Sequence, residues 1–321
     1  MPPPKILIIG SGIAGPALAT LLLQLPLPIP LLPQITLLER SAAPTSHGQN
    51  IDVRGTGIDI LQKLGVEAAV RAATTGEEGV RFVDSRGAVW SEVRADKTGR
   101  VQTGTSDVEI LRGRLAGVLE GRVKAVGGEV EALGGMGVRF VFGDVLAGLE
   151  QEGDGVRVRF AGGGEEERFD LVVGADGLGS ATRKMVWGLE GEEERVKALG
   201  AFCGFFSMPR GETDGVWRRW YHATGRRSIM VRPSGRADRS TVLMIVVNDD
   251  DPAFRAAAKV EKGSVRRQKA LLGEVFGDAG WESERLVAEM WASDDFYYDA
   301  VSQVKLDSWS KGRVVLLGDA G

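Results

Sequence analysis

The stretch KILIIGSGIAG at residues 5–15 decides the fold. After Lys5 come four consecutive apolar residues, as expected for a strand that is buried on both faces of a parallel sheet. Gly10, Gly12 and Gly15 follow in the spacing G-x-G-x-x-G, ahead of an apolar, helix-like stretch at residues 17–25. In this context the glycines permit a tight turn, close approach of a pyrophosphate and close helix packing, and the helix N-terminus attracts phosphate. The sequence therefore predicts a dinucleotide site.

The next predicted strand ends in an acid. Residues 35–38 are apolar, and Glu39 and then Arg40 follow them. A carboxylate at this place in a dinucleotide fold accepts hydrogen bonds from ribose hydroxyls. The interval from Gly15 exceeds the usual length of about 20 residues, because the proline-rich segment at residues 24–34 ends the helix and lengthens the connection. We predict that Glu39 binds ribose; the alternative is a solvated strand end.

Bulk composition excludes several classes of protein. The chain has 321 residues, enough for two domains, and its net charge of −4 argues against a nucleic-acid partner. Cys203 is the single cysteine, which excludes an intrachain disulfide and indicates a reducing, cytoplasmic location. Residues 6–38 carry no charge, but their prolines and glycines would break a membrane-spanning helix. There is also no basic segment typical of a signal peptide.

Periodicity predicts an α/β protein with a second sheet. Residues 198–248 are rich in strand patterns and suggest a largely antiparallel sheet, whereas strands of the nucleotide type occur at the start, middle and end of the chain. The nucleotide domain is therefore expected to be discontinuous and Rossmann-like, with the second domain inserted in it. Helices are predicted at residues 55–64, 66–73, 109–126, 253–276 and 282–290. Further strands are predicted at residues 48–53, 80–84, 88–93, 138–142, 145–149, 156–160, 169–174 and 314–317.

Three further motifs carry a family resemblance. They are DLVVGADGLGSATR at residues 170–183, RVVLLGDAG at residues 313–321 and EILR at residues 109–112. With the first motif they resemble the FAD-dependent monooxygenases of the p-hydroxybenzoate hydroxylase type, the class A flavoprotein aromatic hydroxylases. That family carries a dinucleotide fingerprint, an aspartate–glycine motif and a glycine–aspartate motif in this order. GQNIDVRG at residues 48–55 is similar to a bacterial and fungal subgroup that modifies polyketides, tetracyclines and related polycyclic aromatics.

The resemblance implies a domain division and a reaction. Residues 1–78, 105–186 and 297–321 would form the FAD-binding domain, and residues 79–104 and 187–296 the substrate domain. NAD(P)H would reduce FAD and leave. Oxygen would then add to the flavin as a C4a-hydroperoxide, which transfers one oxygen atom to an aromatic or polyketide-like molecule. No catalytic side chain is named, because the cofactor carries the difficult chemistry.

The resemblance also implies cofactor-binding roles for individual residues. Gly10, Gly12 and Gly15 would carry the pyrophosphate, Glu39 would hold the adenosine ribose, and Arg40 would lie beside the adenine. Gly48 would lie where the chain passes FAD, and Arg112 would contact the flavin side. Asp176, with Gly177 and Arg183, would touch FAD indirectly and help NAD(P)H to engage, and Asp319 would bind the ribityl chain. Two structural alternatives remain: an ion pair of Arg112 with Glu109, and a plain turn at Asp176.

Other residues leave their roles open. Trp217, Trp220 and Tyr221 either line an aromatic substrate pocket or pack a sheet. Arg54 follows a strand that passes near the flavin in the family, so substrate or NAD(P)H contact is one interpretation for it, and the role of Asp52 is similarly open. The two histidines, His47 and His222, have no triad or metal partner in the sequence and are expected on the surface or at a pocket rim.

One departure from the family pattern leads to an expectation about cofactor affinity. The family continues after the glycine–aspartate motif with a loop and a helix that points at the flavin, whereas this sequence ends at Gly321. We therefore expect weak FAD binding and low solubility for a truncated chain, and we keep a catalytically impaired remnant as an alternative. Another FAD oxidoreductase on this fold, such as a reductase, is a further alternative. A halogenase is disfavoured because the motif Trp-x-Trp-x-Ile is missing from the sequence.

Overall fold

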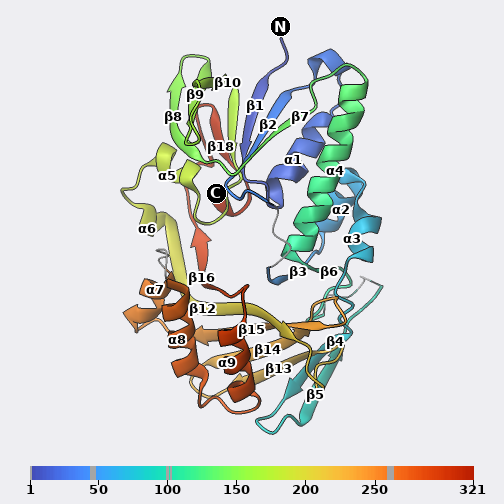
Figure 1. Ribbon diagram of the computed structural model, residues 1–321, viewed down its shortest axis with the longest axis vertical. Coiled ribbons are helices and arrows are strands. Elements are labelled where there is room, and N and C mark those ends of the chain that lie inside the picture. Colours follow the sequence, from blue (N-terminus) through green and yellow to red (C-terminus); the bar gives the residue numbers. More distant parts are fainter. Residues whose placement is uncertain (1, 44–47, 99–100, 102, 259–263) are drawn as a thin grey trace.

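The computed structural model describes residues 2–43, 48–98, 101, 103–258 and 264–321. Two halves lie one above the other in Figure 1, and each is built on a sheet. The upper, six-stranded half contains the sheet β17-β18-β11-β1-β2-β7, and the lower, seven-stranded half contains the sheet β16-β12-β15-β14-β13-β4-β5. Among the described residues, no helix is both long and apolar enough to cross a membrane.

The six-stranded sheet is centred on the strand that the sequence predicted first. β1 (Lys5–Ile9) pairs in parallel with β2 (Gln34–Glu39) and β11 (Leu171–Gly174), so it is enclosed on both edges. Its side chains alternate between two buried faces, which is why the whole run is apolar. The remaining strands of this sheet are β7 (Val138–Phe142), β18 (Val314–Leu316) and the antiparallel edge strand β17 (Ser310–Lys311).

Different layers cover the two faces of this sheet. Ile6 and Ile8 pack in one core with side chains from α1 (Ala14–Leu23) and α4 (Arg112–Ala132). Leu7 and Ile9 belong to a second core with the three-stranded sheet of β8 (Leu146–Glu152), β9 (Gly155–Phe160) and β10 (Glu167–Phe169). Figure 1 shows α1 and α4 to the right of the sheet and β8 to β10 to its left.

A smaller layer joins the six-stranded half to the lower sheet. The strands β3 (Asn50–Asp52) and β6 (Glu109–Leu111) pair in antiparallel fashion beneath α4. The helices α2 (Thr56–Leu64) and α3 (Glu67–Ala72) pack beside them in a separate core. The predicted break between these two helices is confirmed at Gly65, whose φ of 71° is left-handed and favours glycine.

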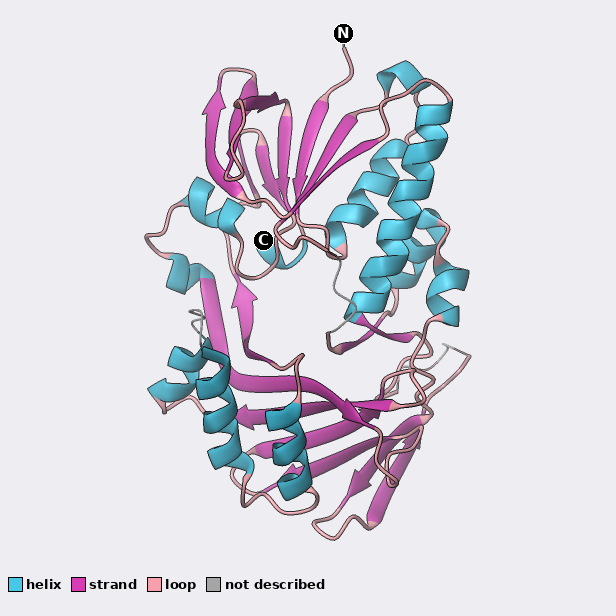
Figure 2. Cartoon of the chain, viewed as in Figure 1, coloured by secondary structure: helices cyan, strands magenta, loops and turns pink. Residues whose placement is uncertain are grey.

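The seven-stranded sheet is antiparallel except between two of its strands, β13 and β4, which are parallel. Its helices pack on one face, where they cover a core that includes Phe202, Phe206 and Met244 (Figure 2). The strands are β4 (Gly79–Val83), β5 (Val89–Arg94), β12 (Val196–Pro209), β13 (Arg218–Ala223), β14 (Arg227–Pro233), β15 (Arg239–Val247) and β16 (Tyr297–Val304). The helices are α7 (Pro252–Ala258), α8 (Ser264–Phe276) and α9 (Ser283–Ala292).

The chain enters this lower sheet twice, which confirms the predicted fold class: a discontinuous Rossmann-like unit with an inserted, largely antiparallel sheet. β4 and β5 come between α3 and β6, and the segment from β12 to α9 precedes the final return through β16 to β18. Two short helices, α5 (Ala181–Trp187) and α6 (Glu192–Arg195), and the 3-10 turns η1 (Ile29–Leu31) and η2 (Gly318–Ala320) complete the described elements.

Several predicted boundaries are wrong, and tertiary contacts explain them. The helix expected from residue 109 begins at Arg112, because Glu109–Leu111 pair with β3 as a strand. The strand expected at residues 169–174 is two strands, since β10 pairs with β9 and β11 pairs with β1. The charged run at residues 190–194 overlaps the short helix α6, in which Glu192 pairs with the buried Arg183.

Candidate active site

The glycine turn after β1 is fixed by steric contact. Gly10 has a φ of 109°, and a Cβ atom there would lie 2.3 Å from the carbonyl oxygen of Ala175. A Cβ atom on Gly15 would lie 1.9 Å from the carbonyl oxygen of Gly10. Neither position therefore accepts another residue without displacing backbone. At Gly12, by contrast, the nearest atom to an added Cβ is Nη2 of Arg112 at 3.8 Å, so this glycine borders open space.

The predicted acid reaches this turn. The carboxylate of Glu39 accepts hydrogen bonds from the backbone N–H groups of Ser11 and Ser41, both at 2.9 Å. These bonds tie the end of β2 to the turn that follows β1. The side chain of Arg40 is exposed and makes no hydrogen bond or ion pair with the described residues. The buried Oγ of Ser11, in the turn itself, also has no hydrogen-bond partner among them.

Three further predicted residues, Gly48, Arg112 and Asp319, lie near the glycine turn and the start of α1. A Cβ atom on Gly48 would lie 3.2 Å from Cβ of Arg112, and the backbone N–H of Arg112 donates to the carbonyl of Gln49 at 2.9 Å. The guanidinium of Arg112 is exposed and has no ion pair or hydrogen bond within the described part of the chain. Asp319, also exposed, lies in η2, where Gly318 would bring an added Cβ within 3.3 Å of Ala14 at the start of α1.

Asp299 on β16 is a further acid in this region, and no sequence pattern predicted it. Burial raises the pKa of Asp299, and the charge of Asp319 adds to this effect while Arg112 opposes it. Asp299 therefore lies within electrostatic reach of both predicted residues. No local motif surrounds it, and only the pairing of β16 with β12 brings it here.

Asp176 and its neighbours organise the start of α5. The carboxylate of Asp176 accepts from the backbone N–H of Thr182 at 2.9 Å and from Oγ of Ser180 at 2.5 Å. Oγ of Ser180 in turn caps the helix by accepting from the N–H of Arg183 at 2.9 Å. Gly177 has a left-handed φ of 76° in this turn.

Arg183 links the two aspartate motifs of the sequence. Its side chain is fully buried and pairs with Glu192 at 2.7 Å. It also donates to the carbonyl of Ala320 at 2.8 Å, so the aspartate–glycine motif is bonded directly to the glycine–aspartate motif. A buried guanidinium with these partners is a structural connection, and its loss would leave an unpaired charge behind.

A cavity of about 640 Å³ lies between the seven-stranded sheet and the part of the upper half formed by residues 48–50 and the start of α4. Its lining combines the segment Gly48, Gln49 and Asn50 with residues of β12, β14 and β15 and with the segment after α9. Four arginines line it: Arg114, Arg232, Arg236 and Arg239. The lining therefore combines these arginines with the carboxylates of Glu289, Asp294 and Asp295 and with the aromatic rings of Phe205, Phe206 and Tyr297.

Side chains from both halves meet at the wall of this cavity. The hydroxyl of Tyr297 accepts a hydrogen bond from the backbone N–H of Gln49 at 3.1 Å and donates to the side-chain carbonyl of the same residue. The ring of Tyr297 stacks on Phe205 with a centroid distance of 4.8 Å. Burial raises the pKa of Tyr297, so its hydroxyl remains a donor. Nearby, Arg239 donates to Oγ of Ser207 at 3.0 Å.

The aromatic residues singled out in the sequence are packing residues. Tyr221 belongs to the core under the helices and donates to the carbonyl of Ala279 at 2.7 Å. Trp220 stacks on Phe82 at 5.4 Å, and Trp217 lies under the guanidinium of Arg81 at 4.3 Å. None of the three aromatics lines the cavity of about 640 Å³, and their contacts favour the packing interpretation.

The remaining open residues lie away from this cavity or outside the description. Arg54 pairs with Asp52 at 3.2 Å and donates to the carbonyl of Thr103 at 2.9 Å, beside a second cavity of about 290 Å³. His222 is exposed and stacks on Trp220 at 4.9 Å. His47 lies outside the residues that the structure describes.

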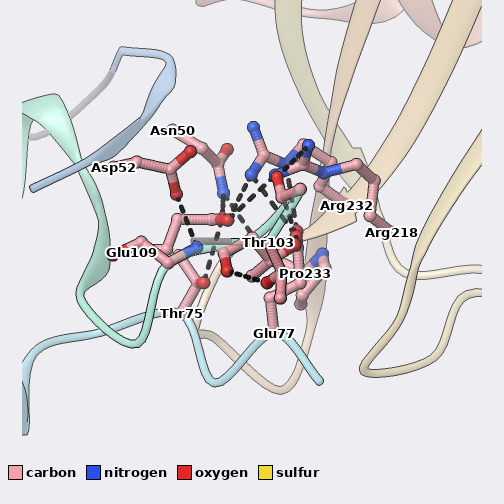
Figure 3. Close-up of polar contacts among 12 residues, drawn as sticks. Asn50, Asp52, Thr75, Glu77, Thr103, Glu109, Arg218, Arg232 and Pro233 are labelled. Atoms are coloured by element: carbon pink, nitrogen blue, oxygen red, sulfur yellow. Dashed lines mark hydrogen bonds and ion pairs between the residues drawn. The ribbon is translucent and has the colours of Figure 1, made fainter. Parts of the chain in front are cut away.

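Glu77, Glu109, Arg218 and Arg232 form a buried ion cluster that no sequence pattern predicted (Figure 3). Glu109 comes from β6 of the upper half, and the two arginines come from β13 and β14 of the lower half. The alternative pairing of Glu109 with Arg112 is therefore wrong. Because the partners lie more than 100 positions away along the chain, no local pattern could have revealed them.

The glycine turn after β1 and the acid at the end of β2, beside a second sheet with a cavity, are typical of an α/β protein that binds a dinucleotide. The profile of the family described as "FAD binding domain" matches residues 4–321. A FAD-dependent monooxygenase of Sarocladium schorii, asL6, is 35% identical over 323 residues, which cover 99% of this chain and 74% of that protein. A flavin-dependent monooxygenase of Legionella longbeachae is 32% identical with the same coverage. The chain therefore belongs to the FAD-dependent monooxygenase family, and it is an oxidoreductase.

Solved structures agree with this assignment. The tetracycline destructase Tet(55) superimposes with a TM-score of 0.80 at 30% identity, covering 99% of this chain and 74% of that one. Klebsiella pneumoniae HpxO, solved with FAD and uric acid, matches with a TM-score of 0.69 at 19% identity, which supports the fold alone. The family resemblance found in the sequence is thus confirmed.

Proposed function

We propose that the protein uses FAD, NAD(P)H and molecular oxygen to insert one oxygen atom into an aromatic or polyketide-like small molecule. The observation that carries the proposal is the cavity of about 640 Å³ between residues 48–50 and the antiparallel sheet, whose lining includes four arginines. Its volume suits a ligand of drug size. The similarity to tetracycline destructases, at 30% identity, supports a substrate of related size and chemistry.

The residues around the glycine turn fit FAD. The glycines at positions 10, 12 and 15 bring no side chain between the start of α1 and a pyrophosphate, and the unpartnered Oγ of Ser11 would be a donor there. We assign Glu39 to the adenosine ribose, where its carboxylate already orders the turn. Arg40 lies beside it on the adenine side.

A second group of residues would hold the flavin end. We assign Gly48 and the unpaired guanidinium of Arg112 to the flavin side, and Asp319 to the ribityl hydroxyls. Asp176 would act indirectly, because its carboxylate is engaged at the start of α5. In domain terms, we assign residues 1–78, 105–186 and 297–321 to FAD binding and residues 79–104 and 187–296 to the substrate side.

Bound FAD supplies the redox chemistry, namely acceptance of a hydride and transfer of an oxygen atom from O₂. The side chains of this protein bind the substrate, orient it and exclude water. Phe205 offers an aromatic face, whereas Arg232 and Arg239 offer donors for substrate oxygens. The contact of Tyr297 with Gln49 keeps the sheet and the cofactor loop in register.

We further propose that NAD(P)H docks transiently and without a fold of its own. The sequence holds one G-x-G-x-x-G that follows a strand and opens a helix, and we assign this motif to FAD. Oxidation of NAD(P)H should therefore require bound FAD. The buried Cys203 is consistent with a reducing compartment such as the cytoplasm.

The test is an oxygen-labelling assay on the FAD-loaded chain. Purified protein is incubated with FAD, NADPH or NADH, isotopically labelled O₂ and a panel of tetracyclines and hydroxylated anthraquinones. Incorporation of one labelled atom into product supports the proposal. NAD(P)H consumption that yields hydrogen peroxide with every member of the panel would contradict the substrate class, and unlabelled product would contradict the monooxygenase reaction. Stoichiometric NADPH binding to the FAD-free chain would contradict transient docking.

A further inference from the structure

The buried ion cluster brings two carboxylates and two guanidiniums together where the halves meet (Figure 3). Glu77 is 1% exposed and Glu109 is 2% exposed. Nη2 of Arg218 lies 2.9 Å from a carboxylate oxygen of Glu77 and 3.1 Å from one of Glu109. Arg232 reaches Glu77 through Nε at 3.0 Å and contacts Glu109 through Nη2. Both arginines are thus shared between both acids.

Neutral side chains complete the surroundings of Glu109. Nδ2 of Asn50 donates to its carboxylate at 2.7 Å, and Oγ1 of Thr75 donates at 3.2 Å. The same Asn50 accepts from Oγ1 of Thr241 at 2.7 Å and donates to the carbonyl of Pro233 at 3.2 Å. Glu109 is therefore held from both halves of the molecule, and it cannot move away from the arginines.

The charge of the cluster depends on one proton. With both acids ionised, the two carboxylates balance the two guanidiniums. Burial raises the pKa of Glu109 to about 7, and the neighbouring Glu77 adds to this, whereas Arg232 and Arg218 oppose it. Burial also disfavours ionised Glu77, but Arg232 and Arg218 hold its pKa below the ordinary value. Near neutral pH the cluster therefore exchanges between a neutral form and a form with one net positive charge.

The net charge of the cluster acts on an ion bound in the cavity, because part of the cluster forms the cavity wall. Arg232 and Asn50 both line it, and Nη1 of Arg232 has no hydrogen-bond partner among the described residues. An anion bound beside Arg232 would repel the carboxylate of Glu109 and so favour its protonated form. Asp52 on β3 acts on Arg232 in the same sense as the two acids. Arg114 and Arg239 elsewhere on the wall attract an anion, whereas the carboxylates of Glu289, Asp294 and Asp295 on the same wall repel it.

We propose that Glu109 makes the cavity selective for a substrate that carries an ionised oxygen, because Glu109 takes up one proton from solvent when that anion binds beside Arg232. The anion is of the phenolate, enolate or carboxylate type. Glu109 acts through Arg232 and is a positioning residue. The proposal rests on the proposed function, since it concerns the same cavity.

The test uses two matched aromatic probes, 2-naphthoate and its neutral amide, on the FAD-loaded protein. Because naphthoate stays ionised from about pH 6 to about pH 9, any change of Kd in this range reports on the protein. The Kd for naphthoate should rise by up to about tenfold for each pH unit above the pKa of Glu109. The Kd for the amide should stay constant. Calorimetry at about pH 8 in two buffers of different ionisation enthalpy should show uptake of about one proton with naphthoate alone.

Two variants sharpen the test. Glu109→Gln should remove the pH dependence and, at about pH 9, bind naphthoate more tightly than the parent by up to about a hundredfold, whereas a merely structural role would weaken binding at every pH. Glu120→Gln is the matched control, because Glu120 is also buried but pairs with Lys124 on α4 at 2.5 Å. It should keep the parent's pH dependence.

Several outcomes would overturn the proposal. Equal affinity for naphthoate and the amide would exclude an anion-selective site. No proton uptake when naphthoate binds to the unmodified protein would exclude the proposed role of Glu109, even if Glu109→Gln failed to fold. A pH dependence that survives in Glu109→Gln would assign the proton to another group. If neither probe bound, both this proposal and the proposed aromatic substrate class would be contradicted. The oxygen-labelling assay would still test the monooxygenase reaction separately.

Discussion

The two halves of this molecule build their sites in different ways. In the six-stranded half the dinucleotide turn is made by backbone, through the glycines after β1 and the start of α1. In the seven-stranded half the cavity is made by side chains from β12, β14 and β15, which come together only through strand pairing. The shape of the glycine turn depends on the positions that have no side chain. The shape of the cavity depends instead on which side chains strand pairing brings together.

This difference sets the expected cost of a substitution. A Cβ atom added to the turn collides with main chain that has no room to move, so the whole element must shift. A side chain truncated in the cavity removes one contact and leaves the sheet intact. The largest effects should therefore lie in the upper half, and the smallest at the wall between the halves.

The strongest test of the backbone site is Gly15→Ala. The added Cβ would lie 1.9 Å from the carbonyl oxygen of Gly10, so we expect loss of FAD binding and destabilisation by more than about 4 kcal/mol. Flavin content after purification and denaturant unfolding measure both effects. Gly121→Ala is the control, because no atom lies within 4 Å of its added Cβ in α4, and it should stabilise by about 1 kcal/mol. Stoichiometric FAD in Gly15→Ala would show that the turn tolerates a side chain.

Arg183→Met tests the connection between the two aspartate motifs. The variant leaves the carboxylate of Glu192 and the carbonyl of Ala320 without their donor, so we expect a loss of about 3–5 kcal/mol in unfolding free energy. FAD affinity should fall with it, since η2 carries Asp319. Arg168→Met removes an exposed ion pair with Asp154 and should leave both quantities unchanged. Similar losses in both variants would argue against a special role for the buried arginine.

The same contrast explains what could be predicted from sequence. β1, the turn and Glu39 were predictable because glycine spacing and an apolar run report backbone geometry directly. The predicted start of α4 was wrong because Glu109 begins the short strand β6. Glu109 pairs there with Asp52 on β3, which lies far away in the sequence. A period of apolar residues describes a helix face, but it does not show where tertiary pairing takes over.

The cavity itself could not be predicted. The sequence drew attention to Trp217, Trp220 and Tyr221, yet the residues that line the cavity include arginines and Phe205 from other strands. Alternate residues of one strand point to opposite faces, so the choice of face depends on register with neighbours far away in the chain. Tyr297 and Asp299 share this property, since pairing of β16 with β12 brings them to the site.

Glu39→Ala probes the acid that links β2 to the turn, and its expected effect is intermediate. The variant leaves the N–H groups of Ser11 and Ser41 without their acceptor and removes the assigned partner of the ribose. FAD affinity should fall by about 1–3 kcal/mol in a fluorescence titration. Glu39→Gln retains an acceptor oxygen and should lose less. Parent-like affinity in Glu39→Ala would remove Glu39 from the cofactor site.

The smallest expected change, in Tyr297→Phe, tests the boundary between the two kinds of site. The variant keeps the ring stacked on Phe205 but deletes the hydroxyl that bonds to Gln49, at a cost of about 1 kcal/mol of stability. Since this hydroxyl joins the sheet to the loop at Gly48, more NAD(P)H should be spent on hydrogen peroxide per product formed, while FAD affinity stays the same.

The neighbouring Tyr298 provides the matched control for that variant. Its hydroxyl donates to the carbonyl of Phe254 at 3.2 Å within the core, on the opposite face of β16. Tyr298→Phe therefore removes one buried tyrosine hydroxyl and its hydrogen bond at a similar cost in stability, but it leaves the cavity wall untouched. The ratio of peroxide to product should rise in Tyr297→Phe and not in Tyr298→Phe. An equal rise in both would mean that general loosening of the sheet, rather than the contact between the halves, controls how the oxygen is used.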